Sequence, residues 1–268
     1  MPAGDIIKLS APTTREYWEV PILFEDDYLL AVDKPSGLLT SPDRYDKDRP
    51  NLMKLLHAGV ADGKPWALQH NRSYLANAHR LDFETSGIIL LAKSKPVLVE
   101  LANQFGSNKP LKRYVALVNG GPVADEFEVD VKISPHPVKL GTMRVDPRYG
   151  KKSRTRFKVL EKFRNHTLLA CVPVTGRTHQ IRIHLRSVRL PIVGDKLYHG
   201  APLKLSSLKR RYIIKEGEVE KPLISRVALH AEGLDLPHPV TGEAVTIKSP
   251  WPKDFAVAVK YLQRFASY

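Results

Sequence analysis

The chain has 268 residues, of which 43% are hydrophobic, and its 42 basic and 28 acidic side chains give a formal net charge of +14. This apolar content excludes a mainly disordered chain and is enough for one large domain or two small ones. The longest uninterrupted apolar runs have five residues, far below the ~20 that a membrane-spanning helix needs. We therefore expect no membrane partner.

Strands outnumber helices along the chain. Residues 1–22 show no strong pattern and are interpreted as an N-terminal arm, ahead of one domain over residues 23–268. Runs of β-branched and aliphatic residues predict strands at Tyr28–Val32, Gly87–Ala92, Tyr114–Val118, Phe127–Ile133, Thr155–Leu160, Thr167–Val172, Val227–His230 and Ala244–Ile247. Helical spacing predicts helices at Asn51–His57, Pro96–Phe105, Thr178–Arg189 and Asp254–Phe265. Because strands and helices do not alternate regularly, we predict an α+β fold with a mostly antiparallel sheet.

The N-terminal sequence and the cysteine content indicate a reducing compartment. The first twenty residues contain no continuous apolar segment, so no secretory signal peptide is predicted. The single cysteine, Cys171, can form neither an internal disulfide nor a thiolate metal cluster. We predict a cytoplasmic protein, which we expect to be a monomer.

A polar, loop-like segment, His79–Gly87, leads directly into the apolar strand Ile88–Ala92. A reactive loop on a rigid strand is a common place for chemistry. Asp82 is the candidate nucleophile or base, and Arg80 beside it could bind an anion. The plainer interpretation is a surface turn in which Asp82 and Ser86 hydrogen-bond backbone amides.

Other enzyme classes fit this loop poorly. In a protein-kinase catalytic loop His-Arg-Asp is continuous, whereas here Leu81 intervenes, and no Gly-rich phosphate loop or Asp-Phe-Gly occurs elsewhere. Asp82 and Glu84 share a face of an extended chain, but such a close pair rarely flanks the sugar bond of a glycoside hydrolase. No dinucleotide or phosphate loop is found, so no nucleotide cofactor is predicted.

Tyr114 lies in a segment, Leu111–Val118, whose alternation points Arg113 to one face and Tyr114 to the other. Tyr114 could sit in the core with its hydroxyl satisfied, the usual fate of a strand tyrosine. It could also stack on a nucleobase.

The segment after Gly176 combines a helix start with several basic residues. Thr178 can cap the helix, on which Arg182, Arg186 and Arg189 share one face. That face could bind phosphates, or one arginine could turn inward and pair with a buried carboxylate. The two histidines of this segment, His179 and His184, are five residues apart, which does not place two ligands on one helical face, so no metal is predicted.

The basic excess is concentrated in the second half of the chain. Residues 1–134 contain 16 basic and 18 acidic side chains, whereas residues 135–268 contain 26 and 10. Between Lys139 and Arg189 there are 14 basic residues and two acidic ones. Such a field suits a polyanion, most often nucleic acid, although a solvated face that keeps the protein soluble is the plainer interpretation.

Taken together, these segments resemble the RluA-type pseudouridine synthases. The resemblance rests on three motifs, His79–Gly87, Lys112–Val118 and Gly176–Arg182, and on the flanking stretches Asp33–Leu38, Val193–Tyr198, Leu229–Ala231 and His238–Glu243. These run in the family's order over about residues 23–252. The resemblance implies a single catalytic domain with a central mixed, mainly antiparallel sheet, flanking helices and an active-site cleft.

The implied activity is isomerisation of uridine to pseudouridine in structured RNA, transfer RNA or ribosomal RNA or both, with the target base flipped out and no cofactor. Asp82 matches the family's catalytic aspartate, and Arg182 the basic residue that pairs with it. Tyr114 matches the tyrosine that stacks on the target base, and Arg80 the arginine that fills the gap left by the flipped nucleotide. The sequence does not choose between attack by Asp82 on the sugar, attack on the base and proton removal from the sugar.

The basic segment then becomes the expected phosphate-binding surface. The residues selected for it are Lys151, Lys152, Arg154, Arg156, Arg177 and Arg186. Only 22 residues precede the predicted domain, too few for the small S4-type RNA-binding domain that many relatives carry at the N-terminus. We therefore expect a compact member whose catalytic domain itself selects the RNA. A non-catalytic RNA-binding module on the same fold is the competing interpretation.

Overall fold

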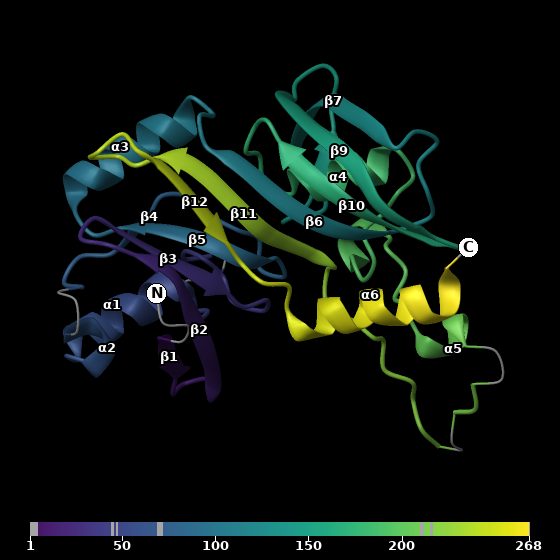
Figure 1. Ribbon diagram of the computed structural model, residues 1–268, viewed down its shortest axis with the longest axis horizontal. Coiled ribbons are helices and arrows are strands. Elements are labelled where there is room, and N and C mark those ends of the chain that lie inside the picture. The colour runs from purple at the N-terminus through teal and green to yellow at the C-terminus, as the bar shows by residue number, and fades with distance from the viewer. Residues whose placement is uncertain are drawn as a thin grey trace. The chain divides into compact units, whose positions relative to one another are not determined.

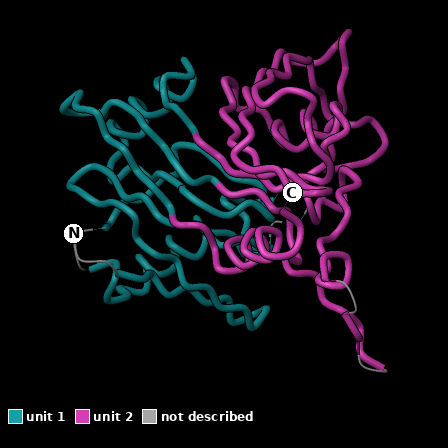
Figure 2. Tube along the Cα trace, turned by 45° about the vertical axis from the view of Figure 1, so that its right-hand side comes forward, with its two compact units in different colours: residues 1–112, 231–249 teal, residues 113–230, 250–268 magenta. Residues whose placement is uncertain are grey.

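The computed structural model describes residues 5–43, 46, 48–68, 72–209, 212–214 and 217–267. The chain folds into two compact units, each built from two segments of sequence (Figure 2). Unit 1 holds residues 1–112 and 231–249, and unit 2 holds residues 113–230 and 250–268. Each unit has its own hydrophobic core.

Unit 1 is a sheet with three helices (Figure 1). Its strands are β1 (Ile6–Ala11), β2 (Glu16–Glu25), β3 (Leu29–Lys34), β4 (Ala76–Asn77), β5 (Ser86–Ala92), most of β11 (Leu229–Pro237) and β12 (Ala244–Lys248). Its helices are α1 (Leu52–Ala61), α2 (Pro65–Leu68) and α3 (Lys95–Gly106). The strand order is β1-β2-β3-β5-β11, with β4 paired to β5 and β12 to β11.

Strand β5 forms the centre of the unit 1 core. Every residue of Ser86–Ala92 is buried, which explains why this strand reads as a continuous apolar run and not as an alternating one. Helix α3 contributes Val97 and Leu101 to the same core. Fully burying one such aliphatic side chain is worth about 1.5–3 kcal/mol. The strand that follows the Asp82 loop is therefore a firm support.

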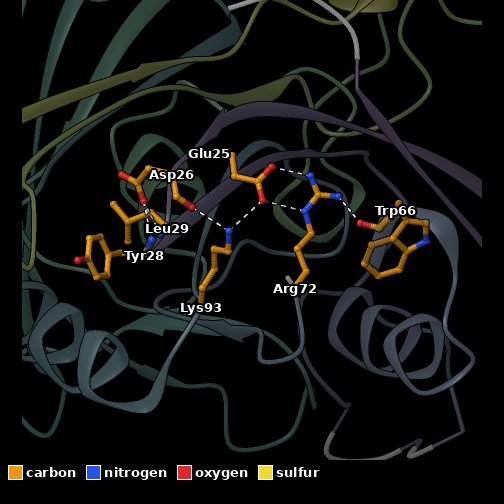
Figure 3. A network of polar contacts seen from close by, with 7 residues as sticks. All are labelled: Glu25, Asp26, Tyr28, Leu29, Trp66, Arg72 and Lys93. Carbon is orange, nitrogen blue, oxygen red and sulfur yellow. Dashed lines mark hydrogen bonds and ion pairs between the residues drawn. The ribbon is translucent and has the colours of Figure 1, made fainter. Parts of the chain in front are cut away.

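A buried polar network joins three segments of unit 1 at the far end of β5 (Figure 3). The Glu25 carboxylate accepts hydrogen bonds from the Arg72 guanidinium and from the Lys93 ammonium. Arg72 also donates to the Trp66 carbonyl, and Lys93 to the Asp26 carbonyl. Burial would raise the pKa of Glu25, but the hydrogen bonds and charges of Arg72 and Lys93 hold it below its usual value.

Unit 2 contains five antiparallel strands in the order β6-β10-β9-β7-β8. Its strands are most of β6 (Leu111–Asn119), β7 (Glu126–Pro135), β8 (Met143–Val145), β9 (Lys151–Phe163) and β10 (His166–Pro173). Its helices are α4 (Gln180–Ser187), the short 3-10 helix η2 (Lys196–Tyr198), α5 (Leu205–Leu208) and α6 (Lys253–Ala266). Phe255, Val259 and Leu262 of α6 share one core with Val115 and Leu117 of β6.

The predicted α+β class is confirmed, and every strand pair with a described register is antiparallel. The structure adds what the patterns did not predict. Within residues 1–22, interpreted as an arm, β1 pairs with the start of β2, and Ile7, Leu9 and Val20 are buried. Among the described residues, no helix is long and apolar enough to cross a membrane.

Candidate active site

The loop that carries Asp82 is held on both sides of that residue through its backbone. Before it, the Leu81 N–H donates to Thr40 Oγ1 at 3.1 Å, and the Thr40 hydroxyl donates to the Leu81 carbonyl at 3.1 Å. After it, the Ser36 hydroxyl donates to the Glu84 carbonyl at 2.8 Å. Asp82 itself is half-buried. Both supporting hydroxyls come from the segment after β3.

The same segment places a fully buried lysine behind the loop. The Lys34 ammonium donates to the carbonyls of Pro35 at 2.8 Å, Leu38 at 2.7 Å and Phe83 at 3.5 Å. The Phe83 carbonyl also accepts the N–H of Gly37 at 2.9 Å. We call residues 34–40 the Asp82 support. Because its bonds run to backbone atoms around Asp82, it fixes the path of the loop.

His79, the first residue of the motif, is a structural residue. Its ring stacks on Phe105 with a centroid separation of 4.9 Å, and its Nε2 accepts the Leu90 N–H at 3.1 Å. Burial, with a contribution from the charge of Lys112, lowers the pKa of His79 to about 3. A neutral imidazole therefore ties the start of the loop to β5, and Arg80 next to it is exposed.

In unit 2, Arg182 of α4 is turned inward. It is 3% exposed, and its Nε and one terminal nitrogen donate to the two oxygens of Asp195 at 2.7 and 2.8 Å. Asp195 is fully buried and also accepts the Tyr198 N–H at 3.2 Å. This bidentate pair is the strong, orienting form of an arginine–carboxylate contact. Of the two alternatives left open for the arginine face, the inward-turned arginine is confirmed for Arg182.

Asp195 is a residue that sequence reasoning missed. The stretch Val193–Tyr198 belongs to the family pattern, but nothing in it showed that its aspartate would meet an arginine thirteen positions earlier. The start of α4 also differs from the prediction. His179, in a left-handed conformation with φ of 53°, precedes the helix as its N-cap, so the prediction that Thr178 caps the helix is wrong.

One glutamine and one histidine of α4, Gln180 and His184, hydrogen-bond the helix to β9. The Gln180 amide donates to the Arg154 carbonyl and to Thr155 Oγ1, both at 3.0 Å. His184 contacts Ser153 at 2.8 Å through Nε2 and Thr155 at 2.9 Å through Nδ1. Burial lowers the pKa of His184 to about 4. Both nitrogens of this ring are used in hydrogen bonds.

His179 is engaged as well, because its Nδ1 lies 2.8 Å from the Tyr198 hydroxyl. Across the described ranges, no group of three or more His, Cys, Asp or Glu side chains is arranged to hold a metal ion.

Tyr114 is half-buried in β6 and packs against the core of unit 2. It lies opposite Cys171 in the register of β6 and β10.

The basic residues selected from the sequence fall into different surroundings. Lys151 and Lys152 are exposed at the start of β9. Arg154 and Arg156, further along the strand, form ion pairs with Glu128 at 4.0 and 3.1 Å. The two remaining residues, Arg177 and Arg186, are exposed before and within α4.

Comparison with known proteins assigns the family. Residues 28–187 match the RNA pseudouridylate synthase family. The chain is 37% identical over 243 residues to the ribosomal large subunit pseudouridine synthase D of Nitrosomonas europaea, covering 90% of this chain and 65% of that relative. It is 32% identical over 237 residues to the dual-specificity RNA pseudouridine synthase RluA of Escherichia coli K12, covering 88% of this chain and 94% of that relative. The chain thus spans less than two thirds of some relatives and nearly all of others.

Solved structures agree with the sequence comparison. Human RNA pseudouridylate synthase domain containing 4 superposes with a TM-score of 0.68 at 26% identity, over 90% of this chain and 92% of that chain. Human RNA pseudouridylate synthase domain containing 1 gives a TM-score of 0.61 at 25% identity, over 87% and 84%. The chain belongs to the RNA pseudouridylate synthase family, a family of isomerases. The resemblance to its RluA-type members is confirmed.

Proposed function

We propose that this chain isomerises uridine in RNA to pseudouridine and that the reaction depends on the carboxylate of Asp82. The observation that carries the proposal is the Asp82 support, which holds the loop at Leu81, Phe83 and Glu84. A reacting group must be kept close to its productive position, and misplacement by about 1 Å can cost 100-fold in rate. A surface turn without chemistry would not require a buried lysine such as Lys34 behind it.

The chemistry is an isomerisation in which nothing is oxidised or reduced. The bond from uracil N1 to ribose C1′ breaks, the ring turns, C5 bonds to C1′, and the proton leaves C5 while N1 gains one. The balance needs no cofactor. Asp82 would assist either by adding to the sugar or base, or by removing a proton from the sugar, and it must be ionised for each route.

The roles proposed for Arg182 and Tyr114 follow from the family motifs that they match. Arg182 would pair with Asp82 and keep it ionised. An arginine has five N–H donors, and Asp195 takes up two of them, so we propose Asp195 as a positioning residue that fixes the guanidinium. Tyr114 would stack on the target base, and the exposed Arg80 would occupy the space left by the flipped nucleotide.

The substrate class is proposed from the relatives. One is named for the large ribosomal subunit and another for dual specificity, which favours ribosomal RNA, transfer RNA or both as substrates of this chain. A monomer in the cytoplasm stays a prediction from the sequence.

Tritium release tests the proposal directly. RNA labelled with tritium at uridine C5 loses the label to water when pseudouridine forms, so the purified chain should release tritium from ribosomal or transfer RNA. The Asp82→Asn variant, purified in the same way, is the control for contaminating activity. Binding of these RNAs without release of tritium would support the non-catalytic module instead.

A further inference from the structure

Strand β9 lies beside β7 (Figure 1). The exposed side chains of β9 are mostly basic, and they fall into two groups. Toward the end of β9 three ion pairs form, Arg156–Glu128 at 3.1 Å, Lys158–Glu126 at 2.8 Å and Lys162–Asp125 at 2.6 Å. We call these six residues the paired ladder. Exposed pairs of this kind add little stability, but their charges cancel locally. This part of β9 therefore offers little net charge to a polyanion.

At the beginning of β9 a basic residue lies opposite another basic residue. Lys152 lies opposite Lys132 in the register of β7 and β9, and like charges directly opposite one another destabilise a sheet. Lys151 precedes Lys152, and the Arg177 Nε–H donates to the Lys152 carbonyl at 3.5 Å. Within the described residues, none of these four basic side chains forms an ion pair. Because these basic side chains repel one another beside the ion pairs of the paired ladder, they indicate a role other than stabilising the fold.

The turn that leads into this basic end is rigid. Asp146 is buried, and its Oδ1 accepts the N–H groups of Tyr149 at 2.9 Å and Arg148 at 3.2 Å. The Tyr149 N–H, followed by the Ser134 hydroxyl, lowers the pKa of Asp146. A Cβ at Gly150 would lie 2.5 Å from the Asp146 carbonyl oxygen, so only glycine fits there. The turn is held in one conformation by bonds to a buried carboxylate.

This rigid turn presents an aromatic ring to solvent. Tyr149 is 74% exposed, and the Arg148 guanidinium carbon lies 5.2 Å from the centre of its ring. The nearby Asp146 does not offset the basic residues, because it is paired with Arg144 at 3.1 Å. We define the basic tip as Lys132, Arg148, Tyr149, Lys151, Lys152 and Arg177. It combines a fixed aromatic face with five cations.

We infer that the basic tip binds an unpaired stretch of the RNA substrate outside the reacting uridine. Proteins hold single-stranded nucleic acid by stacking bases on aromatic side chains and by tracking phosphates with cations. Tyr149 supplies the stacking surface, and Lys151 and Lys152 with their basic neighbours supply the phosphate contacts. Because the turn is already fixed, little conformational entropy is lost on binding. The inference rests on the proposed function for the identity of the ligand as RNA.

The charge contribution is tested with two triple variants that remove the same net charge from the same sheet. The tip variant carries Lys132→Gln, Lys151→Gln and Lys152→Gln. The ladder variant, its matched control, carries Arg156→Gln, Lys158→Gln and Lys162→Gln. Affinity for a single-stranded oligouridine is measured at several salt concentrations.

The tip variant should bind the oligouridine more weakly. Its slope of log affinity against log salt concentration should be smaller by about 2, because three lost phosphate contacts contribute roughly 0.7 each. The ladder variant should keep most of the wild-type slope. Equal losses in the two variants would show that net charge alone matters and would overturn the inference. So would an unchanged slope in the tip variant.

The stacking contribution is tested at Tyr149, with thermal unfolding to check that the fold is kept. Tyr149→Ala should lower the affinity for the oligouridine by about tenfold, because one base–aromatic stack is lost, and leave the salt slope unchanged. Tyr149→Phe should keep the affinity. A base-paired RNA hairpin of equal length should show little difference between these variants, and an equal loss with the hairpin would overturn the stacking role.

These binding measurements do not depend on turnover. If the chain binds at the basic tip but releases no tritium, the proposed function fails while the RNA-binding site stands. If tritium is released and neither the tip variant nor Tyr149→Ala changes RNA affinity, the inference fails alone. If the tip variant keeps its affinity for RNA but no longer binds polyglutamate, the basic tip binds an acidic protein and the inference is overturned.

Discussion

The Asp82 loop of unit 1 and the α4 segment of unit 2 hold their key side chains in different ways. Around Asp82 the supporting bonds from Thr40, Ser36 and Lys34 run to backbone carbonyls and one backbone N–H. Arg182, in contrast, is held by its own side chain through Asp195. A support built on the backbone fixes the path of a loop, whereas a support built on the side chain fixes the position of a charge. This difference is expected if Asp82 reacts with the substrate and Arg182 orients the reacting group.

The largest effect is expected at the reacting group. Asp82→Asn keeps the size and shape of the side chain but removes the ionisable carboxylate. Turnover should fall by at least ~10⁴-fold, the order seen when a member of a catalytic unit is removed, while RNA affinity changes little. Single-turnover conversion and a binding titration with the same RNA measure the two quantities. Near-normal turnover would remove Asp82 from the chemistry.

The next effect is expected at the orienting pair. Asp195→Ala leaves Arg182 buried without its carboxylate, which should cost about 3–5 kcal/mol of stability and also lower turnover at saturating RNA. Asp254→Ala is the matched control, because Asp254 makes a similar bidentate pair with Arg226 at 2.8 and 3.0 Å in the same unit. The control should lower stability and leave turnover unchanged. Equal turnover losses in the two variants would make Asp195 a merely structural residue.

A smaller effect is expected behind the Asp82 loop. Lys34→Met removes the donor to three carbonyls, and a buried group left unsatisfied costs about 1–3 kcal/mol. Because the loop path changes, kcat should fall more than KM rises. Lys93→Met is the control, since Lys93 is also buried in unit 1 but bonds Glu25 and Asp26. If kcat is the same for both variants, the Asp82 support does not position the loop.

The last prediction concerns how the stability of the protein depends on pH through the histidine at the start of the loop. The folded-state pKa of His79 is about 3 and its ordinary value is 6.5, so below pH 6.5 the unfolded chain takes up a proton that the folded chain does not. The contribution of His79 to stability is therefore complete above pH 6.5 and is lost as the pH falls toward 3. His79→Gln, whose amide oxygen can replace Nε2 as the acceptor for Leu90, should show a shallower fall. Chemical denaturation between pH 7 and 4 measures the slope, and identical slopes would contradict a buried, neutral His79.

The sequence predicted most of the fold because the central elements have unambiguous patterns. The apolar run at β5 and the stripe on α3 were predicted with bounds close to those observed. The pairing of β1 with β2 was not predicted, because seven of the ten residues of β2 are partly or fully buried without alternation. The start of β11 was also placed early, since Val227 and Ala228 are buried and apolar but lie outside the strand.

For the candidate site, the sequence supplied residue identities and not their supports. Asp82, Tyr114 and Arg182 could be named from motifs, but Asp195 and Lys34 are placed by tertiary contacts that no local pattern reports. The basic segment shows the same limit. Its charges could be counted along the chain, whereas the division into the basic tip and the paired ladder depends on the register between β7 and β9.

We propose that Asp82 and Arg182 act on one uridine as a single unit. The most direct measurement is a double-mutant cycle with Asp82→Glu and Arg182→Lys, which keep both charges and so leave a measurable single-turnover rate. If the two side chains act together, the double variant should be no slower than about the slower single variant, because residues of one catalytic unit are strongly non-additive. A double variant whose rate loss equals the product of the two single losses would contradict the account.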